Sequence, residues 1–240
     1  GNTLITGILT GLSYFTTGDK RMNYAGSTTA QASTAYVREG AGSQEIIRIE
    51  VVASGNLDPA SLTSMTFNTN GTTRVADIAN AKVYYTGVSN VFSTVTQFGT
   101  TFTSPSGAFT IAGSQVLAEG TNYFWLTYDI AMGVVDNDLV DAECNSITVR
   151  GVAYTPDVQA PGGNRTVKAA LAGVITVGTG GNYPNITGAG GLVEKIAQVG
   201  LKGDVTATVV SDITEPGTNA FTPWYEAGGT GFTLTVTPDA

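Results

Sequence analysis

Alternation of apolar and polar residues is the strongest pattern along the first two thirds of the chain. In Glu45–Val52 the apolar residues Ile47, Ile49 and Val51 alternate with charged residues. A period of two places the apolar side chains on one face of a half-buried strand. Further strands are predicted at Leu62–Thr69, Ala81–Thr86, Val91–Phe98, Ala108–Ala112, Tyr123–Ile130 and Asn145–Val149, with turn sequences between them. Short strands without intervening helices predict an all-β fold, an immunoglobulin-like Greek-key β-sandwich.

A second, smaller unit follows a turn-rich boundary at Pro156–Gly163 and a last short strand at Arg165–Val167. Here strands are predicted at Gly173–Val177, Asp204–Ser211 and Gly231–Thr237, with one helix at Ala189–Val199. Leu192, Ile196 and Val199 share a helix face, and Gly200 is the expected C-cap. We therefore divide the chain into an N-terminal strand or linker segment (1–26), the sandwich (27–168) and a partial strand–helix–strand unit (169–240). The last unit is interpreted as the cap of a larger β-solenoid domain.

One local motif suggests how the sandwich crosses between its sheets. Leu117, Gly120 and Tyr123 have the spacing of a tyrosine corner, in which the Tyr hydroxyl returns to the backbone at a Greek-key crossover. A corner would turn Tyr123 and Trp125 toward the core. Simple alternation instead predicts that the core-facing residues are Phe124, Leu126, Tyr128 and Ile130. Both faces of this strand would be covered if it were central in its sheet.

The charge and hydropathy of the chain exclude some classes of binding partner. The formal charge is −8, and the 11 basic residues are scattered, with only Lys20 and Arg21 adjacent, which argues against nucleic acid and against an anionic membrane surface. No apolar run reaches the roughly 18 residues that span a bilayer, so no membrane insertion is expected. The chain begins with Gly1 rather than Met, as is typical of a mature or excised segment. An extracellular or bacterial cell-surface location is expected.

Residues from about Thr28 to Lys168 resemble the N-terminal domain associated with neuraminidases of the Asp-box-repeat type. The resemblance rests on Glu45–Val52, Leu62–Asn68, Asp77–Thr86, Asn122–Ile130, Asp141–Cys144 and Pro161–Thr166. It implies a β-sandwich in a large secreted or cell-surface protein of Bacteroidetes-like bacteria, exported by the type IX route. It does not imply sialidase activity, because the Asp-box propeller lies elsewhere in such proteins. Residues from about Ala170 onward are similar to the start of the β-helical regions that follow this module.

Candidate chemistry is sparse. The chain has no histidine, which removes Ser-His and Cys-His nucleophilic pairs and typical zinc sites. Cys144 is interpreted as a buried small apolar residue. We predict no catalytic or cofactor-binding residue. The acidic cluster of Asp136, Asp138, Asp141 and Glu143 is interpreted as a solvated loop, with calcium binding as the sharper alternative, although the EF-hand Gly and distal Glu are absent.

Two Gly-rich runs, Gly178–Gly181 and Gly188–Gly191, lack the spacing of phosphate-binding loops and are interpreted as sites of tight strand–helix packing. Aromatic residues could stack on sugars, but core packing is the simpler expectation for most of them; they are Tyr84, Tyr85, Trp125, Tyr128, Phe221, Trp224 and Tyr225.

The sequence thus predicts a non-catalytic structural or adhesive module, with filament formation or gliding as its context and neighbouring domains or subunits as partners. The segment Leu4–Leu12 is a candidate strand for pairing with another subunit or with an adjacent domain. The alternative is a carbohydrate-binding accessory domain of a secreted glycosidase, with glycans as partners. A hydrolase that acts through carboxylates alone, such as Asp138 or Glu143, is the third hypothesis.

Overall fold

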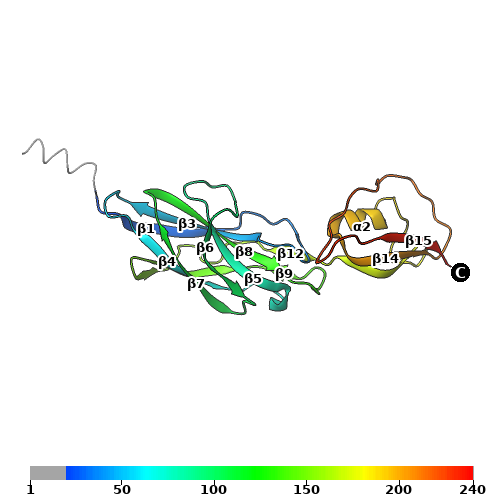
Figure 1. Cartoon of the computed structure of the whole chain (residues 1–240), viewed down its shortest axis with the longest axis horizontal. Coiled ribbons are helices and arrows are strands. Elements are labelled where there is room, and N and C mark those ends of the chain that lie inside the picture. Colours follow the sequence, from blue (N-terminus) through cyan, green and yellow to red (C-terminus); the bar gives the residue numbers. More distant parts are fainter. Residues whose placement is uncertain (1–19, 240) are drawn as a thin grey trace, which may run out of the picture.

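The computed structural model describes residues 20–239, and the predicted strand at Leu4–Leu12 lies outside them. The described chain forms two units arranged end to end along one long axis (Figure 1). The larger unit is a β-sandwich, as predicted, and the smaller unit carries the α-helix. A narrow waist separates them, and the chain passes through it between β12 and β13.

The sandwich consists of a five-stranded and a four-stranded sheet. The first has the order β1-β3-β8-β5-β6, and every pair in it is antiparallel. The second has the order β11-β10-β4-β7 and is also antiparallel. The strands of the first sheet are β1 (Asn23–Ala30), β3 (Gln44–Ser54), β5 (Ile78–Tyr85), β6 (Gln97–Thr103) and β8 (Gly120–Ile130). Those of the second are β4 (Ser61–Asn68), β7 (Ala108–Val116), β10 (Glu143–Val149) and β11 (Val152–Tyr154). A 3₁₀ turn, η1 (Val75–Asp77), precedes β5.

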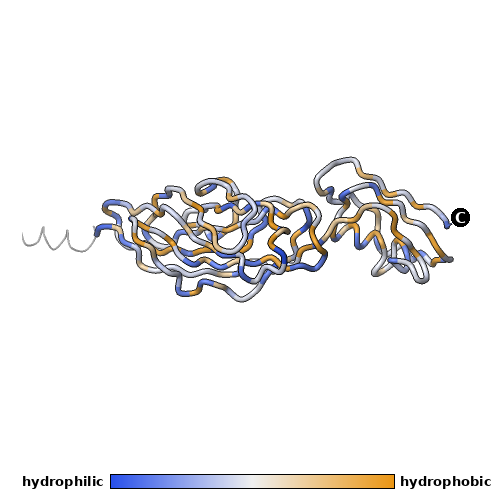
Figure 2. Tube along the Cα trace, turned by 90° about the horizontal axis from the view of Figure 1, so that it is seen from below, coloured by the Kyte–Doolittle hydropathy of each residue, from blue (hydrophilic) through white to orange (hydrophobic). Residues whose placement is uncertain are grey.

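Residues that alternate along the strands fill the space between the two sheets. Ile49 of β3 pairs with Phe124 of β8, and both are fully buried in the core together with Met65 and Phe67 from the facing β4. Figure 2 shows apolar and polar segments interspersed along the chain of the sandwich. The period-2 pattern of the sequence therefore correctly marked the core-facing positions of β3.

The outer face of the central strand β8 is covered as well. Phe124 and Leu126 point into the core, whereas Trp125, only 3% exposed, lies outside that core cluster. Its ring packs against Phe92 at a centroid distance of 5.6 Å, and the Arg48 guanidinium lies 5.8 Å from the ring. Simple alternation was thus right about the core, and both faces are buried as expected for a central strand.

The predicted tyrosine corner is wrong, because the residue before Tyr123 makes the expected contacts. Asn122 is fully buried at the crossover from β7 to β8, whereas Tyr123 is only partly buried. The Asn122 Oδ1 accepts hydrogen bonds from the Ala118 N–H at 2.9 Å and from the Tyr85 hydroxyl at 2.8 Å. Its Nδ2 donates to the Ala118 carbonyl at 2.9 Å. A short amide side chain therefore ties the crossover to the strand.

Two strand boundaries differ from the sequence prediction. Most of Val91–Phe98 is a loop, in which Val91 and Val95 are 70% and 90% exposed, and β6 begins only at Gln97. β1 begins at Asn23 and so overlaps the end of the segment assigned to an N-terminal linker. Its sequence is rich in Gly, Ser and Thr and lacks the apolar alternation that identified the other strands.

The second unit is built on a parallel sheet. Its strands β13 (Leu171–Val177), β14 (Leu201–Val209) and β15 (Leu234–Pro238) pair in that order, and both pairs are parallel. The helix α2 (Leu192–Val199) connects β13 to β14, and its buried Leu192 and Ile196 pack on the core of this sheet. Gly200 ends the helix with a φ of 80°, as predicted, and its N–H donates to the Ile196 carbonyl.

A third, small sheet lies at the end of the sandwich that faces the second unit. It has the order β2-β12-β9, in which β2 (Val37–Arg38) runs parallel to β12 (Arg165–Lys168) and β9 (Leu139–Val140) runs antiparallel. Because β12 leads directly into β13, this sheet places Arg38 and its neighbours beside the entry to the second unit. Over residues 20–239, no helix has the length and apolar character needed to cross a membrane.

Candidate binding cleft at the junction of the two units

Glu39 is the central polar group of the junction. It follows β2, and its N–H donates to the Lys168 carbonyl at 3.0 Å, which continues the pairing of β2 with β12. The residue is fully buried although it carries a carboxylate. A buried carboxylate requires hydrogen-bond donors or a cation around it, because desolvation of an unpaired charge is costly.

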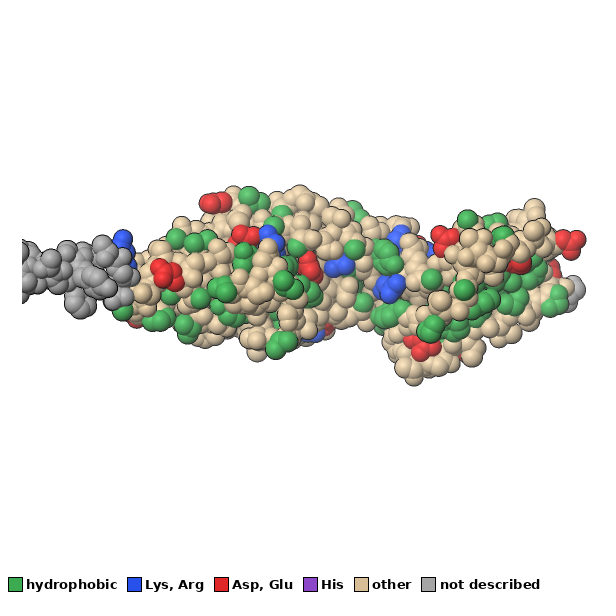
Figure 3. All heavy atoms as spheres, turned by 90° about the horizontal axis from the view of Figure 1, so that it is seen from above, with side chains coloured by type: hydrophobic (Ala, Val, Ile, Leu, Met, Phe, Trp, Pro, Cys, Tyr) green, Lys and Arg blue, Asp and Glu red, His purple; other side chains and the backbone are tan. Residues whose placement is uncertain are grey.

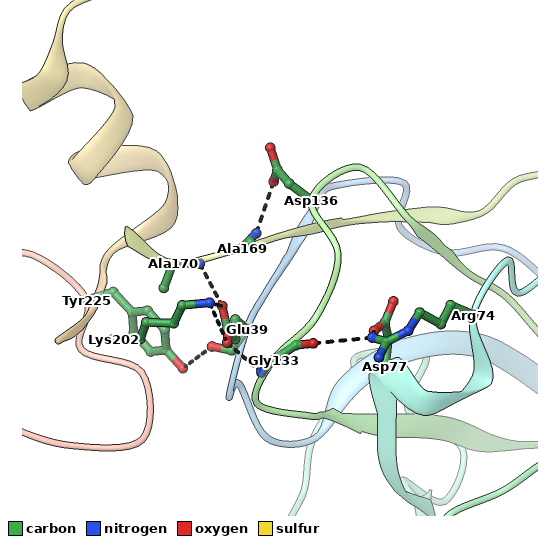
Figure 4. Close-up of polar contacts among 9 residues, drawn as sticks. All are labelled: Glu39, Arg74, Asp77, Gly133, Asp136, Ala169, Ala170, Lys202 and Tyr225. Atoms are coloured by element: carbon green, nitrogen blue, oxygen red, sulfur yellow. Dashed lines mark hydrogen bonds and ion pairs between the residues drawn. The ribbon is translucent and has the colours of Figure 1, made fainter. Parts of the chain in front are cut away.

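Groups from both units satisfy Glu39 (Figure 4). Its carboxylate accepts hydrogen bonds from the Gly133 N–H at 2.7 Å and from the Ala170 N–H at 2.9 Å. Lys202 of β14 forms an ion pair with it at 3.0 Å. The Tyr225 hydroxyl donates to the Glu39 backbone carbonyl at 3.1 Å. One buried side chain of the sandwich thus contacts two separate segments of the second unit.

Arg38 adds a second connection. Its Nε donates to the Gln198 carbonyl at 2.8 Å and its Nη2 to the Ala197 carbonyl at 3.2 Å. These carbonyls belong to the last turn of α2, where a cation also interacts favourably with the helix dipole. The guanidinium lies 5.7 Å from the ring centroid of Tyr36 and 5.5 Å from that of Tyr225. Arg38 is therefore fixed between one ring from each unit.

A cleft of about 450 Å³ opens at this point, lined by Ala35, Tyr36, Arg38, Ala41, Gln44 and Tyr225. Arg165, which is buried, holds its sandwich side in place by donating to the backbone carbonyls of Ala35, Tyr36 and Glu45. Burial lowers the pKa of Arg165, and the nearby Glu45 carboxylate opposes that effect. The cleft thus presents two aromatic rings, a guanidinium and an amide on a supported backbone, which is the mixed apolar and polar lining of small-molecule sites.

The four acidic residues proposed for calcium have separate surroundings. Asp136 belongs to the junction: it pairs with Lys195 at 3.3 Å and accepts the Ala169 N–H at 3.0 Å. Glu143 accepts hydrogen bonds from Asn70 and Asn145. Within residues 20–239, no group of three or more Asp, Glu, Cys or His side chains is arranged to hold a metal ion.

The other two carboxylates of that set have distinct neighbours. Asp138 is a neighbour of the buried Asp77, which also pairs with Arg74. Burial, followed by this contact with Asp138, raises the pKa of Asp77. Burial and the adjacent Glu143 carboxylate raise the pKa of Asp141 to about 6, against the opposing hydrogen bond from the Ala142 N–H. The acidic segment therefore contributes Asp136 to the junction, whereas Asp138, Asp141 and Glu143 have their neighbours within the sandwich.

Most of the other residues singled out in the sequence lie outside the junction cleft. Cys144 is fully buried, and its desolvation raises its pKa to about 12, which suits an inert apolar residue. Tyr128 is also fully buried, whereas Phe221 is 59% exposed on the second unit. Among the aromatic residues considered for stacking, only Tyr225 lines the junction cleft.

Sequence reasoning did not identify Tyr36, Arg38 or Glu39. Their partners include residues about 90 to 190 positions away, and no local pattern connects them. The one available signal was a Tyr-Val-Arg-Glu run in which charged residues directly follow a buried position, Val37. Only the pairing of β2 with β12 shows that this run faces the second unit.

A comparison with protein families finds a match over most of the larger unit. The family model described as the N-terminal domain of BNR-repeat neuraminidase matches residues 26–151. Among solved structures, the Hadza microbial sialidase Hz136 is similar, with a TM-score of 0.46 and 12% sequence identity. The similarity covers 58% of this chain and 31% of the sialidase chain. No curated protein matches the sequence.

Proposed function

Because the chain belongs to the family of the N-terminal domain of BNR-repeat neuraminidase, we propose that it is a non-catalytic structural module of a secreted protein, in which the sandwich holds the second unit in one orientation. The observation that carries this proposal is the fully buried Glu39, which contacts Lys202 and Tyr225 of the second unit. An extracellular setting, with an adhesive role for the parent protein, forms part of the proposal.

The chemistry of the junction supports a fixed connection. An ion pair adds little net stability over an apolar contact, but the fully buried carboxylate of Glu39 restricts geometry because it must keep its donors and its cation. Glu39 is bonded to the loop at Gly133, to the linker at Ala170 and to β14 through Lys202. Rotation of the second unit would separate Glu39 from Lys202 and leave the carboxylate without its cation. A module of this kind acts as a rigid spacer.

The orientation can be measured with two spin labels, one in each unit. Val116 of β7 and Val174 of β13 are exposed, so cysteines at these positions can be labelled, whereas Cys144 is buried. We expect a narrow distance distribution in the parent chain and a broader one after Glu39→Gln. The control Glu50→Gln removes a carboxylate that pairs with Arg48 on the outer face of the sandwich and should leave the distribution unchanged. A distribution equally broad in all three chains would refute the rigid-spacer proposal.

Carbohydrate binding is the second candidate, and the junction cleft is the observation that favours it. Tyr36 and Tyr225 supply ring surfaces, and Arg38 and Gln44 supply polar groups, within about 450 Å³. Aromatic rings with a few fixed polar groups are the usual lining of sites for small polar ligands.

A glycan array probed with the full chain tests this candidate. We expect binding that is lost after Tyr36→Ala and that is the same with calcium and with a chelator, since the cleft contains no carboxylate side chain. Absence of binding to any glycan would dismiss the candidate and leave the structural role. Binding that required calcium and survived Tyr36→Ala would place the site elsewhere on the molecule.

A further inference from the structure

We infer that the junction cleft binds a saccharide that carries a carboxylate, with the Arg38 guanidinium as the partner of that anion. This inference rests on the carbohydrate-binding candidate and adds the charge and position of the ligand. It starts from a contrast between the two arginines of the sandwich that lie against pairs of aromatic rings, Arg38 and Arg48.

The two arginines differ in their acidic partners. Arg48 lies near Tyr123 and Trp125, and its guanidinium pairs with Glu50 at 2.5 Å. Arg38 lies near Tyr36 and Tyr225, but it forms no ion pair with any residue between 20 and 239. The charge of Arg48 is thus compensated within the protein, whereas that of Arg38 is not.

Part of the Arg38 guanidinium is free to bind a ligand. Nε and Nη2 donate to the carbonyls at the end of α2, and Nη2 also lies 3.4 Å from the Tyr36 hydroxyl. For Nη1, the described part of the chain provides no hydrogen-bond partner. A guanidinium presents its N–H groups in a plane that matches two carboxylate oxygens. A carboxylate at the cleft would therefore complete the hydrogen bonding of this group.

The guanidinium is also held in place before any ligand arrives. Two carbonyls fix one edge, and its central carbon lies over the rings of Tyr36 and Tyr225. A side chain already held in its binding conformation loses little conformational freedom on association. The Tyr36 side chain is more than a third exposed, so its ring is available to a ligand bound at Arg38.

The charged side chains around the cleft favour binding of an anion at Arg38. Lysine and arginine side chains gather around the waist (Figure 3), but Lys195 pairs with Asp136 and Lys202 pairs with Glu39. Because the whole chain carries a net charge of −8, attraction of an anion to the cleft must come from the local positive charge of Arg38. Such attraction is strongest at low ionic strength, and salt should weaken it.

The cleft also combines both units, because Tyr225 belongs to the second unit and the other lining residues belong to the sandwich. A ligand seated there would contact both and depend on their orientation. The volume of about 450 Å³ lies within the range of small-ligand sites, roughly 300 to 1,000 Å³.

Matched pairs of glycans test the inference on the full chain. Methyl β-glucuronide and methyl β-glucoside differ only at C6, where a carboxylate replaces a hydroxymethyl group, and 3′-sialyllactose and its carboxyl methyl ester test a second acidic sugar. Binding is measured by titration with NMR detection at low and high salt. We expect the acidic member of at least one pair to bind about tenfold tighter or better, as one charge-assisted hydrogen bond allows. Which pair shows the preference distinguishes a uronic acid from a sialic acid as the ligand.

Three variants assign the preference to Arg38. Arg38→Gln should remove it, whereas Arg48→Gln, which changes the arginine already paired with Glu50, should retain it. Lys202→Gln loosens the junction but leaves Arg38 in the cleft. It should therefore weaken the binding of acidic and neutral sugars equally. Equal binding of acidic and neutral members would overturn the inference but leave the carbohydrate-binding candidate intact. Binding of none of the four sugars would overturn both, and an acidic preference that survives Arg38→Gln would refute the role of this residue.

Discussion

Asn122 shows how a single amide can hold a crossover between two sheets. Its side-chain oxygen accepts hydrogen bonds from the Ala118 N–H and the Tyr85 hydroxyl, and its side-chain nitrogen donates to the Ala118 carbonyl. All of these contacts lie in or next to the core. We expect Asn122→Ala to lower the free energy of unfolding by about 2–3 kcal/mol, because buried donors and acceptors lose their partners. Urea unfolding followed by fluorescence, in a variant that retains Trp125 as its single tryptophan, measures the change.

Tyr123→Phe is the matched control for that prediction. No hydrogen bond to the Tyr123 hydroxyl is found in the described residues, and the ring itself is only partly buried. Removal of the hydroxyl should therefore change stability by less than about 0.5 kcal/mol. A large loss with Tyr123→Phe and a small one with Asn122→Ala would restore the tyrosine corner.

Asp141 gives the sandwich a pH dependence of defined sign. Burial raises its pKa to about 6, whereas an unfolded Asp titrates near 3.9. Between these values the folded state binds more protons than the unfolded state, so the contribution of Asp141 to stability falls as pH rises from about 4 to 6. Because the side chain is only half buried, Asp141→Asn should add about 1 kcal/mol at pH 7 and nothing at pH 3. Thermal unfolding at both pH values checks this, and an equal shift at pH 3 would contradict it.

Elements with strong periodicity were predictable, and those without it were not. The alternation in Glu45–Val52 identified β3, and the spacing of Leu192, Ile196 and Val199 identified the buried face of α2. β1 was missed because its polar residues reveal no buried face. Val91–Val95 contains two valines and Phe92, but it is a loop in which both valines are exposed, so apolar residues alone did not ensure strand pairing.

Gly200 tests how the end of α2 meets the following segment. It has a φ of 80°, and a Cβ there would lie 2.2 Å from the Tyr225 carbonyl oxygen. Gly190, with a φ of 70°, has no atom within 4 Å of the same position. Gly190→Ala should therefore cost only the backbone strain, about 1–2 kcal/mol, and Gly200→Ala should cost at least about 2 kcal/mol more. Unfolding followed by Trp224 fluorescence measures both changes, and equal losses would show that the segment at Tyr225 moves freely.

At the scale of the whole molecule, the two units have separate apolar cores joined by polar contacts. The sandwich core and the core around Leu192 and Ile196 form distinct clusters. The junction between them depends on Arg38 and Glu39, whose partners lie far along the chain. Such contacts follow from the parallel pairing of β2 with β12, which no local pattern in the sequence reveals. The fold class was therefore predictable, whereas the site at the waist was not.

Because the two cores are separate, a destabilising substitution in the second unit should not lower the stability of the sandwich. The chain has two tryptophans, and they report on different units: Trp125 lies on the sandwich and Trp224 packs against the second core. Ile196 is 4% exposed in that core, so Ile196→Ala should lower the stability of the second unit by about 2–4 kcal/mol. In single-tryptophan variants, the transition seen by Trp224 should shift by that amount and the transition seen by Trp125 by less than about 0.5 kcal/mol. If both tryptophans reported the same shift, the polar junction would couple the units into one cooperative structure, because two independent cores cannot share the loss of one buried side chain.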